Sequence, residues 1–83
     1  VDEDFKEKYF ATKRTIQELK FKKDRIDRLL SLISFHYKQY LEEKLPLMID
    51  AAQRQIEGLR KEKEEIDIEI GDRQAVLDVM IGE

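Results

Sequence analysis

Residues 5–40 read FKEKYFATKRTIQELKFKKDRIDRLLSLISFHYKQY, and a series of mostly large side chains recurs in them in alternating steps of four and three. This alternation is the spacing of the a and d positions of a coiled-coil helix. The positions are Phe5, Tyr9, Thr12, Ile16, Leu19, Lys23, Ile26, Leu30, Ile33, Tyr37 and Tyr40. No glycine or proline interrupts the series, so the stretch predicts one long helix over about 3–44.

The phase of this series fails at residues 42–47, which contain the only proline of the chain, Pro46. Proline lacks an N–H and is favoured at the first turn of a helix, and it pushes the preceding residue out of the α region. We therefore expect a turn at Lys44 and Leu45, within a loop between Leu41 and Met48. No glycine, asparagine or serine supports this turn, so one continuous kinked helix is an alternative.

A second helix is expected over about 47–70, with its own series in steps of three and four. Its positions are Ile49, Ala52, Ile56, Leu59, Lys63, Ile66, Ile70, Arg73, Leu77 and Met80. Gly71 followed by Asp72 could form a C-cap and a new N-cap, which would separate a short last helix over 72–81.

The two series fit together if the chain folds back on itself. In an antiparallel pair, a positions face d positions, so the residue numbers of facing partners have a constant sum. Here that sum is 89, which places bulky Tyr37 against small Ala52 and sets no two charges in one layer. The sequence thus predicts a single all-α domain over 1–83, a long antiparallel helical hairpin. Its predicted core is Ile16, Leu19, Ile26, Leu30, Ile33, Tyr37, Ala52, Ile56, Leu59, Ile66 and Ile70.

The composition restricts the function. Charged residues make up 42% of the chain, which suits elongated helices that bury one stripe. The net charge of −3 argues against direct nucleic-acid contact from this segment, because phosphate binding needs a basic excess. The chain has no cysteine and no apolar run near the ~20 residues of a membrane span, so we expect a cytoplasmic protein without membrane contact.

Several large apolar residues lie off the helix–helix series. Phe10, Phe21 and Leu32 are spaced by eleven residues, which returns to nearly the same helix face after three turns, and Phe35 follows. Such a line of exposed apolar side chains indicates a partner, most simply a second copy of the chain. We therefore predict a homodimer, paired as a four-helix bundle, whose interface contains Phe10, Phe21, Leu32 and Phe35.

Catalytic chemistry is not indicated. The single histidine, His36, has no metal ligand three or four residues away, so neither a metal nor another cofactor is expected. Adjacent carboxylates such as Glu64 and Glu65 point in different directions on a helix. We predict that the chain is not an enzyme. A small apolar pocket around His36, lined by Phe35, Tyr37 and Tyr40, is the remaining alternative to plain packing.

Two stretches resemble a known family. The acidic-aromatic opening Asp2-Glu3-Asp4-Phe5 and residues 16–33, IQELKFKKDRIDRLLSLI, look like the long dimerisation helix of MerR-family bacterial transcription regulators, most similar to the multidrug-sensing branch. This resemblance implies a regulator that dimerises through this helix and senses an effector further toward the C-terminus. The family's winged-helix DNA-binding domain would lie upstream of Val1. The absence of cysteine excludes the metal-sensing branch.

Two functions are therefore expected as alternatives. In the first, the chain is the non-enzymatic dimerisation and effector-side region of a transcription regulator. In the second, it is a coiled-coil protein–protein interaction module, such as an adaptor, an assembly subunit or a small chaperone, whose phenylalanine stripe receives another protein.

Overall fold

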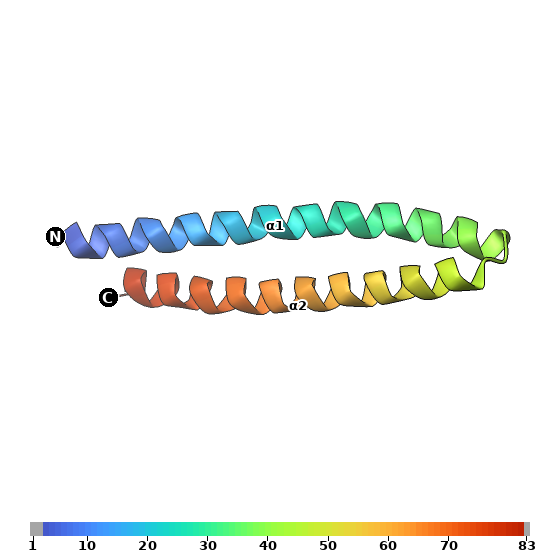
Figure 1. The fold of residues 1–83 in the computed structure, drawn as a ribbon. Coiled ribbons are helices and arrows are strands. Elements are labelled where there is room, and N and C mark those ends of the chain that lie inside the picture. The colour runs from blue at the N-terminus through green and yellow to red at the C-terminus, as the bar shows by residue number, and fades with distance from the viewer. Residues whose placement is uncertain (1–2, 83) are drawn as a thin grey trace.

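A computed structural model describes residues 3–82, which form two antiparallel helices (Figure 1). Helix α1 spans Glu3–Glu42 and helix α2 spans Pro46–Gly82. The helices lie side by side along their length, with both chain ends at one end and the loop at the other (Figure 1). The molecule measures 63 × 14 × 14 Å. The predicted all-α helical hairpin is confirmed, and the alternative of one continuous kinked helix is excluded.

The reversal of the chain takes only residues 43–45. The Leu45 N–H donates to the Tyr40 carbonyl at 3.1 Å, and the Lys44 N–H donates to the Leu41 carbonyl at 3.3 Å. These are the two hydrogen bonds of a Schellman motif, whose penultimate residue adopts the left-handed conformation. Lys44 takes that position with a φ of 56°, without the glycine that usually occupies it.

Helix α2 begins immediately after this turn. The Leu45 carbonyl accepts the first helical hydrogen bond from the Ile49 N–H at 2.9 Å, so Leu45 is the N-cap residue and Pro46 is the first helical residue. Proline suits this position because it has no N–H to leave unpaired. The turn thus falls at Lys44 and Leu45 as the sequence predicted.

Two predicted boundaries were wrong. The first helix ends at Glu42 rather than near residue 44, because residues 43–45 form the turn and the Schellman hydrogen bonds come from Lys44 and Leu45. The separate last helix over 72–81 does not exist, since α2 continues through Gly71 to Gly82. Gly71 does not have a positive φ, so it forms no C-cap. The contacts beyond Gly71, where Leu77 is buried, hold the helix on α1 and offset the cost of a glycine, about 1 kcal/mol.

The contact between the helices follows the two predicted series. Ile16, Ile26, Ala52, Ile66 and Leu77 are buried. The remaining predicted core residues are half-buried, namely Leu19, Leu30, Ile33, Tyr37, Ile56, Leu59 and Ile70. A narrow pair of helices cannot enclose these side chains completely, so one seam of half-covered layers supplies most of the apolar burial.

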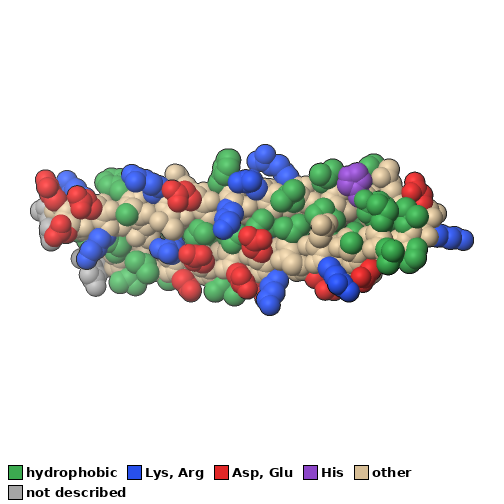
Figure 2. Space-filling view, viewed as in Figure 1, with side chains coloured by type: hydrophobic (Ala, Val, Ile, Leu, Met, Phe, Trp, Pro, Cys, Tyr) green, Lys and Arg blue, Asp and Glu red, His purple; other side chains and the backbone are tan. Residues whose placement is uncertain are grey.

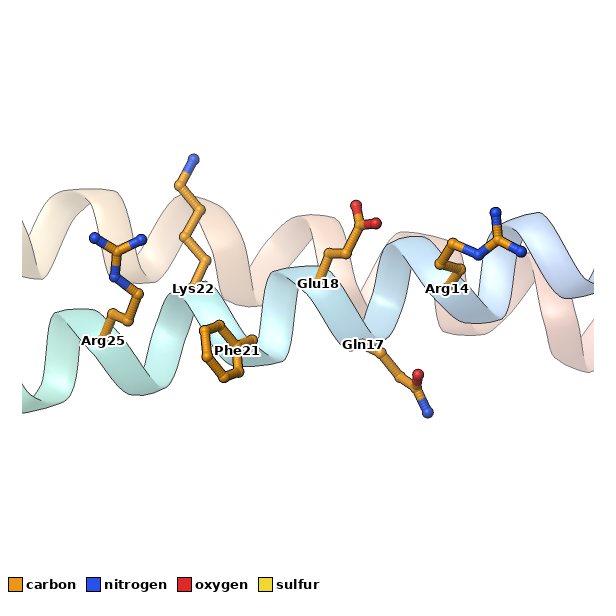
Figure 3. A pocket seen from close by; sticks show the side chains of 6 residues that line it. All are labelled: Arg14, Gln17, Glu18, Phe21, Lys22 and Arg25. Carbon is orange, nitrogen blue, oxygen red and sulfur yellow. The ribbon is translucent and has the colours of Figure 1, made fainter.

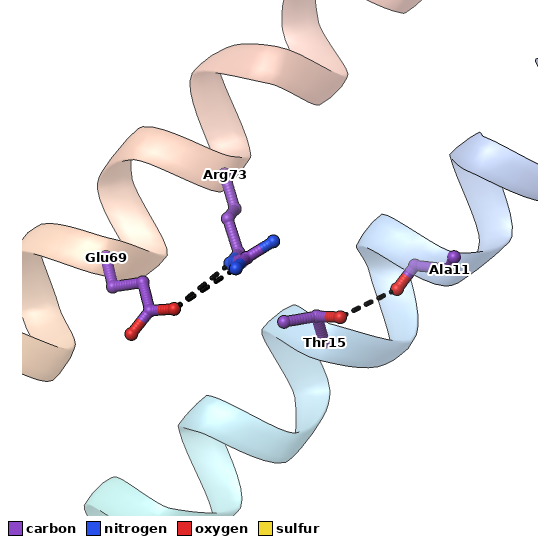
Figure 4. A network of polar contacts seen from close by, with 4 residues as sticks. All are labelled: Ala11, Thr15, Glu69 and Arg73. Atoms are coloured by element: carbon purple, nitrogen blue, oxygen red, sulfur yellow. Dashed lines mark hydrogen bonds and ion pairs between the residues drawn. The ribbon is translucent and has the colours of Figure 1, made fainter.

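Polar residues inside the seam are paired at its margins. The Tyr37 hydroxyl accepts a hydrogen bond from Gln53 Nε2 at 3.0 Å, across the layer where Tyr37 meets Ala52. Arg73 does not reach across to α1. Its guanidinium donates to Glu69 Oε1 at 3.2 Å, one turn earlier in α2, much as the Thr15 hydroxyl donates to the Ala11 carbonyl within α1 (Figure 4).

Candidate interaction surface

The side of α1 that faces away from α2 carries exposed aromatic side chains. Because the a and d positions contact α2, the f position of each heptad lies diametrically opposite to it. Phe21 and Phe35 occupy f positions fourteen residues apart, and their side chains are 63% and 59% exposed. Phe10 and Leu32 are also exposed and lie on either side of this line, at b and c positions. We call the side of α1 that carries Phe10, Phe21, Leu32 and Phe35 the outer face of α1.

Long polar side chains surround Phe21 on the outer face (Figure 3). An open hollow of about 440 Å³ lies beside its ring, and α1 alone lines it. The lining residues are Arg14, Gln17, Glu18, Phe21, Lys22 and Arg25. Their aliphatic stems extend the apolar surface while the charged ends remain in water. An exposed aromatic ring within a polar and mostly basic rim has the composition of a protein–protein contact.

A second apolar area lies on one flank of the hairpin near the loop. Figure 2 shows hydrophobic side chains gathered around the histidine at that end, whereas charged side chains dominate the other half of the same face. A hollow of about 230 Å³ opens there, lined by Ile33, His36, Tyr40, Met48, Ala51, Ala52 and Gln55. His36 and Tyr40 thus border a hollow as expected, but Phe35 and Tyr37 do not. The His36 ring stacks on Tyr40, with centroids 6.3 Å apart.

Two ion pairs join the helices near the middle of the hairpin, and neither was predicted from the sequence. Lys23 Nζ lies 2.5 Å from Asp67 Oδ1, and Lys63 Nζ lies 2.6 Å from Asp27 Oδ1. Lysines in a helix–helix seam commonly pack their aliphatic stems and extend the ammonium group into water, whereas here each ammonium group pairs with an aspartate of the other helix. The signal was present, since each aspartate directly follows the isoleucine that faces the lysine.

Within residues 3–82, no group of three or more histidine, cysteine, aspartate or glutamate side chains is arranged to hold a metal ion. In the same part of the chain, neither helix has the length and apolar character needed to cross a membrane.

Comparison with known proteins gives no match to this chain, whether against family models, curated proteins or solved structures.

Proposed function

We propose that this chain is a non-enzymatic self-assembly module, which joins two copies through the outer face of α1. The observation that supports this proposal is the exposure of Phe21 and Phe35 on the side of α1 opposite α2. The seam of α1 is already covered by α2, so neither ring packs against the other helix. The Phe35 ring meets only the edge of the neighbouring His36 ring, with centroids 5.8 Å apart. A phenylalanine buries about 150–250 Å² when it is enclosed, so their burial between chains would supply a substantial driving force.

The thin core of the hairpin supports the same function. Only five of the described residues are buried, and all of them lie in one seam. Small cores of this kind commonly depend on association for their stability, because the backbone entropy lost on folding is about 1–2 kcal/mol per residue. Pairing two hairpins through the outer face would bury a second apolar surface. Because this face lies opposite α2, the four helices would lie in one row, rather than around the common core of the four-helix bundle expected from the sequence.

A second candidate function is the dimerisation and effector-side region of a transcription regulator. The stretches that resemble MerR-family regulators lie almost entirely on α1, the helix with the exposed phenylalanines. In such a regulator the outer face of α1 would form the dimer contact, and DNA contacts would come from an upstream domain. The parent reading frame tests this candidate. A winged-helix domain directly before Val1 would favour it, whereas its absence would favour an adaptor, an assembly subunit or a small chaperone.

Light scattering of the chain at micromolar concentration tests self-assembly. We expect a mass of twice 10.0 kDa for the wild type and close to 10.0 kDa for the double variant Phe21→Glu/Phe35→Glu. The matched control is Ile68→Glu/Val79→Glu, which places the same charges on comparably exposed residues of α2 and should leave the dimer intact. A wild-type mass of 10.0 kDa would contradict the proposal.

A further inference from the structure

Five residues of α1 follow one another at intervals of seven along its outer face. They are Arg14, Phe21, Arg28, Phe35 and Glu42, all at f positions opposite α2. We call them the outer line. Its centre is Arg28, with one phenylalanine on each side at equal distance. Its two ends carry opposite charges.

We infer that a second copy of the chain docks on this line in the antiparallel direction, with a two-fold axis at Arg28. This inference rests on the proposed self-assembly and names its geometry. Facing residue numbers then add to 56, so Phe21 contacts Phe35 of the second copy, and the same contact recurs on the other side of the axis. The ends of the line also match, because Arg14 meets the second copy's Glu42. The interface is therefore self-complementary, as a closed two-fold dimer requires.

Other arrangements fit less well. In a parallel pairing each residue of the outer line would face its own copy, so Arg14, Arg28 and Glu42 would all meet like charges. The f positions of α2 offer no alternative aromatic line, because they are Leu47, Arg54, Lys61, Ile68 and Ala75. Only the antiparallel pairing of α1 with α1 aligns the aromatic rings and gives opposite charges at both ends.

The two arginines at the axis have nearby acids. Asp24 precedes Arg28 by one turn on a position that flanks the outer line. In the antiparallel dimer the Asp24 carboxylates of the two copies lie on opposite sides of the axis, each within one turn of the other copy's Arg28. The charges of two arginines and two aspartates thus cancel at the centre of the interface. Such pairs are partly exposed, so they contribute more to orientation than to affinity.

The same alignment provides an occupant for the hollow on the outer face of α1. The hollow beside Phe21 would receive the ring of Phe35 from the second copy, against the stems of Arg14 and Arg25 (Figure 3). At 1.5 Å per residue, the contact from Arg14 to Glu42 would extend over about 42 Å. That length is about two thirds of the 63 Å long hairpin.

Cysteine cross-linking tests the position of the axis, and the chain has no native cysteine to interfere. The single variant Arg28→Cys should form a disulfide-linked dimer under mild oxidation, because only a residue on the axis faces its own copy closely. Lys61→Cys, at the corresponding outer position of α2, is the matched control and should not cross-link. Efficient linkage through Lys61→Cys, with none through Arg28→Cys, would overturn the arrangement.

Charge reversal tests the ends of the line. Arg14→Glu and Glu42→Arg should each weaken the dimer about tenfold, since each replaces two attractive contacts by repulsive ones. The double variant Arg14→Glu/Glu42→Arg should recover wild-type affinity in analytical ultracentrifugation. Additive losses in the double variant would overturn the antiparallel alignment. If the dimer persists and remains sensitive to Phe21→Glu/Phe35→Glu, self-assembly itself still stands. A monomeric wild type would overturn both proposals.

Discussion

The ammonium group of Lys23 on α1 lies 2.5 Å from the carboxylate of Asp67 on α2. The pair formed by Lys63 and Asp27, at 2.6 Å, repeats this relation with the two helices exchanged. In both pairs the residue numbers add to 90, one more than in the apolar layers. A shift of one helix by a heptad would separate both pairs by about 10 Å, so together they favour the observed register.

The first prediction concerns alkaline pH. The hydrogen bond with Asp67 raises the pKa of Lys23 above its ordinary value of 10.5, although burial acts in the opposite direction. The folded state therefore binds this proton more tightly than the unfolded state. The resulting stabilisation is complete below pH 10.5 and is lost as the pH rises through the raised pKa. Wild type should be more stable than Asp67→Asn at neutral pH, and the difference should shrink as the pH rises above 10.5 and through the raised pKa of Lys23.

Chemical denaturation at both pH values measures this difference. Other groups that titrate in the same range do so in both proteins and cancel in the comparison. Asp72→Asn, on the outer side of α2, serves as the control and should show no pH-dependent difference from wild type. A gap between wild type and Asp67→Asn that is the same at both pH values would refute the role of the ion pair.

The second prediction compares two isoleucines of α2 that are two residues apart. Ile66 is 5% exposed in the seam, whereas Ile68 is 59% exposed on the outer side. Ile66→Val should lower the free energy of unfolding by about 0.5–1.5 kcal/mol, because it removes a buried methyl group. Ile68→Val removes the same group from the surface and should change it by less than about 0.5 kcal/mol. Urea denaturation of the two variants at one protein concentration decides this, and equal effects would mean that the seam is misplaced.

Much of this fold could be predicted from the sequence because one periodic pattern specifies it. The spacing of residues such as Ile16, Ile26 and Ile66 identifies the buried stripe, and Pro46 marks where the stripe changes direction. The behaviour of Gly71 could not be predicted from local propensity. Whether a glycine ends a helix depends on the packing beyond it, and here Leu77 holds the following turns on α1.

The candidate site was only partly predictable. Phe21 and Phe35 stand out in the sequence because they break the seam pattern, and the structure places both on one exposed face. The pairing of Lys23 with Asp67 was not predicted, because the heptad pattern gives the position of a seam lysine but not the partner of its ammonium group. The side chain of lysine is long and flexible, so this partner depends on the residues that folding brings near. The proposed partner of the outer face is a second chain. The sequence of one chain indicates such a partner only where its own surface is self-complementary.

The third prediction tests the hairpin directly. Leu30 and Leu59 belong to one layer of the seam, and both are half-buried between the helices. Leu30→Cys/Leu59→Cys should form a disulfide within one chain, since facing seam positions approach closely enough for an unstrained bond. Non-reducing electrophoresis and mass spectrometry separate the two outcomes. Formation only between chains would indicate that α2 packs on another copy, as in a domain-swapped dimer. The matched control is Leu30→Cys/Ile68→Cys, whose second cysteine faces away from α1 and should not link within the chain.

The last prediction concerns the turn. Lys44 has a φ of 56°, a left-handed conformation that costs a residue with a Cβ atom about 1 kcal/mol and costs glycine almost nothing. Lys44→Gly should therefore stabilise the hairpin by about 0.5–1 kcal/mol, less the entropy that glycine adds to the unfolded chain. Lys44→Val should destabilise it, because β-branched residues are strained most in this region. Thermal and urea unfolding of the two variants measure the effect. Lys61→Gly is the control, since it places glycine within α2 and should cost about 1 kcal/mol. If Lys44→Gly is destabilised as much as Lys61→Gly, Lys44 does not occupy the left-handed position of a Schellman turn.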